Sequence, residues 1–278
     1  MSGTNLKEQE KPQILIGTSG FSYQDWKGHF YPETISDRDM LRHYAKTFNA
    51  VEINSSYYAI PQPKNMEAMV KKTEGNLEFV VKAHQDITHN REKAEEALPA
   101  FKEGIKPFQN HNVLGCVLLQ FPFSFRHTQF NKDYIAMLKD RMEFLPVVAE
   151  FRNKWWVQDK TFDFLREHEI GYCCVDEPQL PGLPPPTAVA TSPIGYVRFH
   201  GRNKEKWWKH EKAQERYDYL YKEDELKEWV VRIQALLPIV KKIFVFFNNH
   251  PRGQSAINAL AMVKLMAPHS HLKGKLKE

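Results

Sequence analysis

Polar residues that could carry out acid–base chemistry follow several short apolar segments of the chain, at the point where each segment ends. Carboxyl and imidazole groups are the usual proton carriers in enzymes. Four such residues stand out, namely Glu52, Glu150, Asp176 and His200. The pattern predicts a catalytic site in which Glu150 or Glu52 acts as the base and His200 is its proton partner.

Cationic, amide, hydroxyl and aromatic side chains in the same places could bind a substrate. These candidates are Ser19, Tyr23, Trp26, Asn54, Lys82, His84, Gln120, Arg152, Arg198, Arg202, Asn203, Asn248 and Asn249. Guanidinium groups bind carboxylate and phosphate through paired hydrogen bonds, so the expected ligand is a small anionic molecule, and a polyhydroxylated one is also compatible. Isomerisation, hydrolysis and lyase chemistry all remain open.

A divalent metal ion is conceivable but not favoured. His84, Glu150, Asp176 and His200 come from four different segments, and one ion could bind them all. However, the sequence has no HxH or HExxH motif, and the cations expected in the same region oppose a metal. The sequence also lacks GxGxxG after its first apolar segment and has no Walker A motif, so it names no cofactor.

A purely structural role is the alternative for any one of these charges. Glu150 and Arg152 could simply neutralise Arg198 and Glu52. Apolar residues would serve a structural purpose at less cost, so the whole set favours a functional site. Glu52 and Glu150 could also form a carboxylate pair like that of glycoside hydrolases, but nearby arginines would keep both ionised.

The apolar segments are rich in β-branched and aromatic residues, which is typical of strands. They are residues 14–17, 50–57, 77–83, 114–121, 147–151, 171–175, 195–199 and 243–247. Helical patterns separate most of them, at 37–48, 63–72, 91–109, 131–143, 160–167, 223–237 and 253–266. This alternation predicts a TIM-type (β/α)₈ barrel, with an open doubly wound sheet as the second possibility.

In such a barrel the carboxyl ends of the strands meet at one mouth, where active sites lie. Paired polar residues such as Glu150 and Arg152 are two positions apart, so they share the inward face of a strand. Their neighbours Ile53, Ala83, Phe151 and Phe199 should then point outward to the helices.

Two connections differ from the rest. Segment 178–193 contains six prolines and cannot form an ordinary crossover helix. Segment 201–222 mixes basic, acidic and aromatic residues, which suits a solvated lid or a surface for nucleic acid. We expect one barrel domain at residues 13–268, between flexible tails at 1–12 and 269–278.

Composition indicates a soluble globular protein. Of 278 residues, 42% are hydrophobic and 26% are charged, and the net charge of +5 is only mildly basic. No apolar run approaches the roughly 18 residues of a membrane helix, and the polar N-terminus does not resemble a signal peptide. The three cysteines lie in apolar segments, as buried thiols of a cytoplasmic protein would. No feature indicates an oligomeric state.

Several motifs together resemble the YecE-like family, domain of unknown function 72, and especially its YunF-type members. They include GTSGFSYQDWKGHFYP, FNAVEINSSYY, VVKAHQDITH, AEFRNKWW, VDEP, VRFHGRN and FFNNH, spread from about residue 14 to 266. The resemblance implies a TIM-type barrel and no established reaction. The family often has EFRHxSW where this chain has EFRNKWW, so Asn153 replaces a histidine.

Two classes of function follow from these observations. The first is an enzyme that acts on a small anionic molecule at the barrel mouth. The second is a protein that binds a nucleotide or nucleic acid, including a metal-dependent phosphodiesterase or endonuclease. Net charge, Arg198, Arg202 and segment 201–222 motivate the second.

Overall fold

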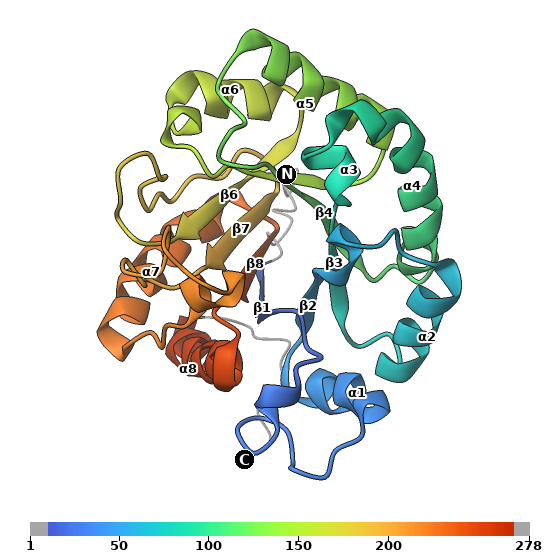
Figure 1. The fold of residues 1–278 in the computed structure, drawn as a ribbon, viewed down its shortest axis with the longest axis vertical. Helices are drawn as coiled ribbons and strands as arrows, with labels where there is room; N and C mark the ends of the chain where they lie inside the picture. The colour runs from blue at the N-terminus through green and yellow to red at the C-terminus, as the bar shows by residue number, and fades with distance from the viewer. Residues whose placement is uncertain (1–10, 270–278) are drawn as a thin grey trace, which may run out of the picture.

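Eight parallel strands form one closed barrel in a computed structural model that describes residues 11–269 (Figure 1). Each strand pairs with the next in the chain, and the first also pairs with the last. The strands are β1 (Gln13–Ser19), β2 (Ala50–Ile53), β3 (Glu78–Lys82), β4 (Leu114–Gln120), β5 (Val147–Glu150), β6 (Ile170–Asp176), β7 (Ile194–Phe199) and β8 (Lys242–Phe247). The predicted TIM-type barrel is confirmed, and the open doubly wound sheet is wrong.

Helices surround the barrel on its outside (Figure 1). They are α1 (Asp37–Thr47), α2 (Pro63–Thr73), α3 (Gln85–Thr88), α4 (Ala94–Asn110), α5 (Gln129–Met142), α6 (Asp159–Glu167), α7 (Glu223–Leu236) and α8 (Gln254–Met266). The apolar spacing that predicted the first of these places Met40, Leu41 and Tyr44 on its buried face. Between β6 and β7 the described chain has no helix, as the prolines of this connection require.

Alternate residues of each strand face two different apolar layers. Inward-facing residues fill the lumen; they are Leu15, Ala50, Val80, Cys116, Leu118, Val148, Cys173, Val175, Tyr196, Phe244 and Phe246. Ile53, Ala83, Phe151 and Phe199 belong instead to the layer between strands and helices, as predicted. All three cysteines are free and buried. These apolar side chains fill the interior of the barrel below the carboxyl ends of the strands.

The predicted tails at 1–12 and 269–278 lie almost wholly outside the described residues. Within residues 11–269, no helix is both long enough and apolar enough to cross a membrane.

Candidate functional site

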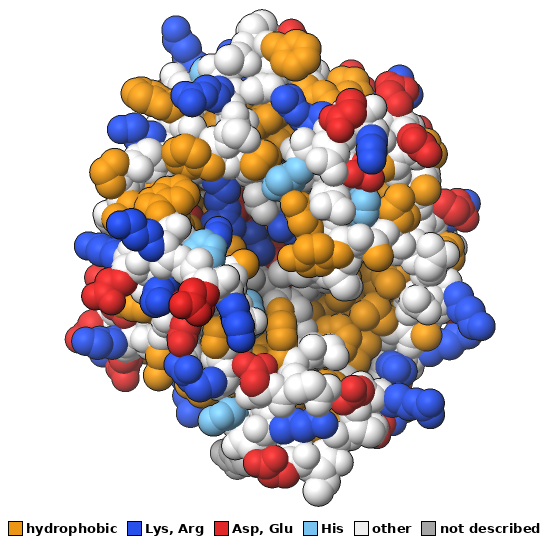
Figure 2. Space-filling view, in the orientation of Figure 1, with side chains coloured by type: hydrophobic (Ala, Val, Ile, Leu, Met, Phe, Trp, Pro, Cys, Tyr) orange, Lys and Arg blue, Asp and Glu red, His pale blue; other side chains and the backbone are white. Residues whose placement is uncertain are grey.

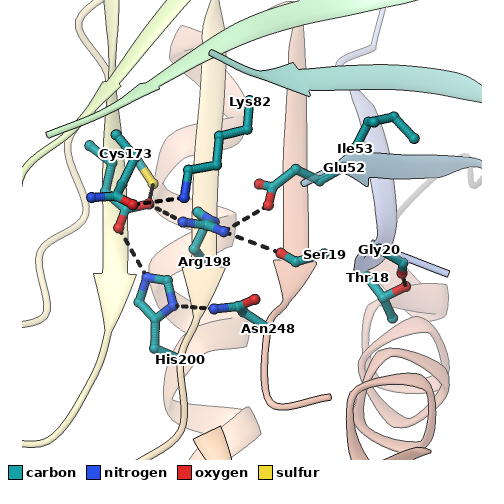
Figure 3. A network of polar contacts seen from close by, with 12 residues as sticks. Thr18, Ser19, Gly20, Glu52, Ile53, Lys82, Cys173, Arg198, His200 and Asn248 are labelled. Atoms are coloured by element: carbon teal, nitrogen blue, oxygen red, sulfur yellow. Dashed lines mark hydrogen bonds and ion pairs between the residues drawn. The ribbon is translucent and has the colours of Figure 1, made fainter. Parts of the chain in front are cut away.

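Strand register brings a layer of polar side chains together directly above the apolar lumen. Ser19 pairs with Glu52, Gln120 pairs with Glu150, and Val175 pairs with Arg198. Because residues two apart share a face, the polar residues that end the strands continue the inward-facing rows below them. Figure 3 shows Ser19, Glu52, Lys82, Arg198 and His200 pointing from different strands toward one interior space.

Arg198 lies at the centre of this layer and is only 1% exposed. Its Nη2 donates to Glu52 Oε1 at 2.7 Å, and its Nη1 donates to Glu150 Oε2 (Figure 3). Tyr196 donates its hydroxyl to the other oxygen of Glu52 at 2.6 Å. Burial opposes the charge of Arg198, but the two carboxylates raise its pKa well above the ordinary value. Arg198 is therefore a permanent cation that fixes both acids.

Glu150 is fully buried and is shared between two arginines. Arg152 Nε lies 2.6 Å from Glu150 Oε1, as an ion pair without hydrogen-bond alignment. Burial alone would raise the pKa of Glu150, but Arg152 and Arg198 hold it well below its usual value. Such a carboxylate stays ionised at neutral pH and is a weak base.

His200 is fully buried and is hydrogen-bonded at both ring nitrogens. Its Nε2 lies 3.2 Å from Glu150 Oε1, and its Nδ1 lies 3.1 Å from the amide nitrogen of Asn248. Burial and the charge of Arg152 lower the pKa of His200 to about 3. The ring is therefore neutral. It accepts from Asn248 at Nδ1 and donates from Nε2 to Glu150.

Glu177 also faces this layer, although the sequence analysis did not single it out. It lies two residues beyond Val175, which faces the lumen, and it is 1% exposed. Arg152 Nη1 donates to its Oε2 at 3.3 Å, and its Oε1 has no hydrogen-bond partner among residues 11–269. Burial raises the pKa of Glu177 to about 8, so this carboxyl carries a proton at neutral pH. Its inward position follows by alternation once the structure shows that Val175 faces the lumen.

Lys82 is a partly exposed cation at the same level. Its Nζ donates to Gln120 Oε1 at 2.8 Å and lies 4.3 Å from the centre of the Tyr57 ring. Gln120 donates its own amide to the backbone oxygen of Phe121, which orients Oε1 toward the lysine. Burial, with a contribution from Arg198, lowers the pKa of Lys82 to about 7. Within residues 11–269, no carboxylate forms an ion pair with it.

Asp176 does not reach this layer, because it faces away from the lumen. It accepts two hydrogen bonds from Arg202, at 2.9 and 2.8 Å. Tyr221 and Trp229 donate to it at 2.7 and 2.6 Å. These donors belong to segment 201–222 and to α7, so Asp176 connects the end of β6 to both. This placement argues against the predicted catalytic role.

Several other predicted binding residues also hold segment 201–222 against the end of the barrel. Asn203 donates to the backbone oxygens of Glu215 and Asp218, and Asn249 donates to that of Tyr219. These contacts fix segment 201–222 over β7 and β8. Arg202 and the two amides are therefore not brought into the polar layer.

The aromatic residues after β1 divide into two roles. Trp26 is fully buried in the outer layer and donates its Nε1 to the backbone of His250, so it does not line the mouth. Tyr23 is partly exposed, donates to the backbone oxygen of Ser19 at 2.7 Å and stacks on His250.

The residues considered for a metal do not converge. Within the described part of the chain, no three His, Cys, Asp or Glu side chains form a group that could hold a metal ion. Asp176 faces outward, Glu150 is bound by two arginines, and His84 accepts from the backbone of Asp86 as the cap of α3. Asn153, which replaces a histidine of the family pattern, caps the turn that follows β5.

Figure 2 shows a hollow near the centre of one face, with Lys and Arg side chains at its floor and hydrophobic ones around it. Loops after the strands supply exposed aromatic residues, among them Tyr58, Phe123 and Trp208. Phe123 and Trp208 contact each other edge to face, with ring centres 5.5 Å apart. Asn54 adds a buried carbonyl oxygen without a partner.

The sequence matches a protein family model and a named bacterial protein. Residues 15–277 match the family model described as "Protein of unknown function DUF72". The chain is 34% identical over 269 residues to the UPF0759 protein YunF of Bacillus subtilis (strain 168), covering 91% of this chain and 94% of that protein.

Solved structures of DUF72 family proteins are also similar to this chain. A DUF72 family protein from Thermotoga maritima MSB8 superposes with a TM-score of 0.85 at 39% identity, covering 92% of this chain and 99% of that one. One from Enterococcus faecalis V583 gives 0.83 at 29% identity, with 96% and 100% covered. SacUVDE, at 11% identity with a TM-score of 0.52 and coverage of 93% and 99%, shares the barrel fold alone.

Proposed function

Because the chain belongs to the DUF72 family of proteins of unknown function, whose description assigns no reaction, we propose a function from the geometry of the barrel mouth: the protein is an enzyme that binds a small anionic molecule there and moves protons on it.

The charge of Lys82 carries this proposal. Arg152 and Arg198 are balanced by Glu52 and Glu150, so the charges of these four residues sum to zero. Glu177 and His200 are neutral at pH 7, since the pKa of the first is about 8 and that of the second about 3.

The protonated form of Lys82 is left, a partly exposed ammonium group that among the described residues contacts an amide oxygen and an aromatic ring. An anionic ligand in the hollow would supply its missing counter-ion. Arg152 could add a second contact, because its Nη2 has no hydrogen-bond partner among the described residues.

Two groups of the layer have a pKa near neutrality, as proton transfer at pH 7 requires. Glu177 is protonated and can act as the acid. Lys82, with a pKa of about 7, can act as the base when it is neutral. Glu52, Glu150 and His200 remain candidate proton carriers. The two carboxylates contact the arginines, and His200 contacts Glu150 and Asn248, which favours a positioning role for all three.

A panel of small carboxylates and phosphate esters, each with a neutral analogue, tests this proposal by calorimetry. We expect micromolar to millimolar affinity for some anions and at least tenfold weaker binding by Lys82→Met. Lys64→Met is the matched control, because Lys64 is exposed on α2. Equal affinity in wild type and Lys82→Met, or a preference for the neutral analogues, would contradict the proposal.

A nucleotide is a second candidate for this ligand. Phe123 and Trp208 are 40% and 52% exposed at the rim and could stack on a base while the cations meet its phosphate. Nucleoside monophosphates and the matching nucleosides therefore belong in the panel. Weaker nucleotide binding by Trp208→Ala, with unchanged binding of simple anions, would favour this candidate.

A further inference from the structure

We infer that Lys82 is a reacting amine, which forms an imine with the carbonyl group of a small anionic aldehyde or ketone. This inference rests on the function proposed above and names the class of its substrate. It distinguishes Lys82 from a lysine that only attracts the anion.

The surroundings of Lys82 differ from those of the other inward cations. Arg152 and Arg198 each contact carboxylates, which stabilise the charged form. Among the described residues, Lys82 contacts the oxygen of Gln120 and the face of Tyr57, and no acid is paired with it. A cation that served only to neutralise the acids of this layer would be paired with one of them, as both arginines are.

The side chain also has the accessibility that a nucleophile needs. It extends from the end of β3 into the interior space where Arg198 lies (Figure 3), and part of its surface remains exposed. Lys82 is thus the less buried of the two cations and the one that a molecule entering the hollow meets first, whereas Arg198 is only 1% exposed.

Several charged or titratable groups surround this nitrogen, from different strands and loops. The set comprises Arg152, Arg198, Glu52, Glu150, His89 and Tyr57. Burial and Arg198 lower the pKa of Lys82 to about 7, and the two carboxylates only partly oppose this. His89 is neutral, since burial and Lys82 lower its pKa to about 4.

A lowered pKa leaves a large fraction of the amine unprotonated at neutral pH. Roughly half of Lys82 is neutral at pH 7, whereas for a lysine of ordinary pKa the fraction is on the order of one in a few thousand. Desolvation beside another cation is a known way of activating a lysine for imine formation.

The step balances without a cofactor. The lone pair of Nζ attacks the carbonyl carbon, the C=O π electrons move to oxygen, and the oxygen takes up a proton while nitrogen loses one. The resulting C–O bond then breaks with a further proton, water leaves, and a C=N bond forms. Nothing is oxidised or reduced. When the imine is protonated, it keeps the positive charge of Lys82 next to the anionic group of the substrate.

Reductive trapping tests this inference on the intact protein. Pyruvate, glyoxylate and dihydroxyacetone phosphate are each incubated with the protein and sodium cyanoborohydride at pH 7, followed by peptide mapping. We expect at least one probe to add its reduced mass at Lys82, at a rate at least tenfold above that of any exposed lysine. Neutral dihydroxyacetone should react at Lys82 at least tenfold more slowly than its phosphate.

The pH profile of trapping gives a second readout. The rate at Lys82 should rise from pH 6 and level off above about pH 8, because the neutral amine is the reacting form. The slower rate at exposed lysines should instead keep rising above pH 8. In Lys82→Arg the adduct at position 82 should vanish, and in Lys64→Met it should persist. Since the wild-type peptide map stands alone, the test does not depend on the variants folding.

The two proposals fail in different ways. Anion binding that depends on Lys82, combined with no preferential adduct at Lys82, would overturn the imine and leave the anion site intact. Equal trapping of neutral and anionic carbonyl compounds at Lys82, without anion affinity, would overturn the anion site. Adducts spread evenly over exposed lysines would also overturn the imine inference.

Discussion

Arg198 is the residue on which the polar layer depends, since it contacts Glu52 and Glu150 at once. Removing one partner of a buried ion pair leaves an uncompensated charge and costs about 3–5 kcal/mol. We predict that Arg198→Met lowers the free energy of unfolding by about that amount, as measured by urea denaturation.

A double variant separates lost charge balance from lost packing. In Arg198→Met, Glu150 keeps Arg152, but Glu52 keeps only the Tyr196 hydroxyl. Adding Glu52→Gln should therefore recover part of the lost stability. Equal stability of the single and double variants would show that the stranded carboxylate is not the source of the cost.

Glu177 should make stability depend on pH in a specific direction. Its pKa rises from 4.5 in the unfolded chain to about 8 in the native protein, so the folded state binds the extra proton between these values. The contribution is fully present below about pH 4.5 and is lost as pH rises through 8. At about 1.4 kcal/mol per pKa unit, the effect is a few kcal/mol.

We predict that the difference in free energy of unfolding between Glu177→Gln and wild type shifts in favour of the variant from pH 5 to pH 9. Urea denaturation at both pH values measures this shift. Glu92→Gln, at an exposed position, is the control and should shift neither value. Parallel pH profiles for Glu177→Gln and wild type would mean that Glu177 is ionised in the native protein.

At the scale of elements, Asp176 joins the end of β6 to α7 and to segment 201–222. Its carboxylate accepts from Arg202, Tyr221 and Trp229. We predict that Asp176→Asn destabilises the protein by about 2–3 kcal/mol, because charged and neutral donors lose an ionised acceptor. Chemical denaturation measures this cost.

The same variant separates the outward carboxylate from the inward site. Because Asp176 faces away from the polar layer, the folded variant should keep wild-type anion affinity and trapping at Lys82. If Asp176→Asn is fully folded but binds anions much more weakly than wild type, Asp176 takes part in the site, as the sequence predicted.

At the scale of the whole molecule, segment 201–222 pairs some of its charges with acids and buries two of its rings, while several of its lysines stay exposed. Arg202 and Lys206 are tied to acids, and the rings of Trp207 and Tyr221 are buried. We predict weak binding of a labelled single-stranded 20-mer, with a slope of log K against log salt shallower than about −2, in fluorescence anisotropy. A steeper slope would indicate several phosphate contacts and favour the nucleic-acid hypothesis.

The sequence by itself determined the barrel and most of the residues at its mouth. Alternating apolar segments and helical patterns predict eight βα units, and pairs two residues apart, such as Arg198 and His200, place polar groups on the inward face. These signals are local, so they are readable without coordinates. The absence of a helix after β6 was equally readable from its prolines.

Only the tertiary structure decided which polar residue of β6 faces inward and which charges are paired. A strand read alone does not say which of two adjacent acids faces the lumen; pairing of Val175 with Arg198 turns Asp176 outward and Glu177 inward. Likewise, the arginines find their carboxylates across the barrel, from residues far apart in the chain. Only the assembled layer shows that Lys82 has no carboxylate partner among the described residues. The reason is that charge balance is a property of the whole layer and not of any single strand.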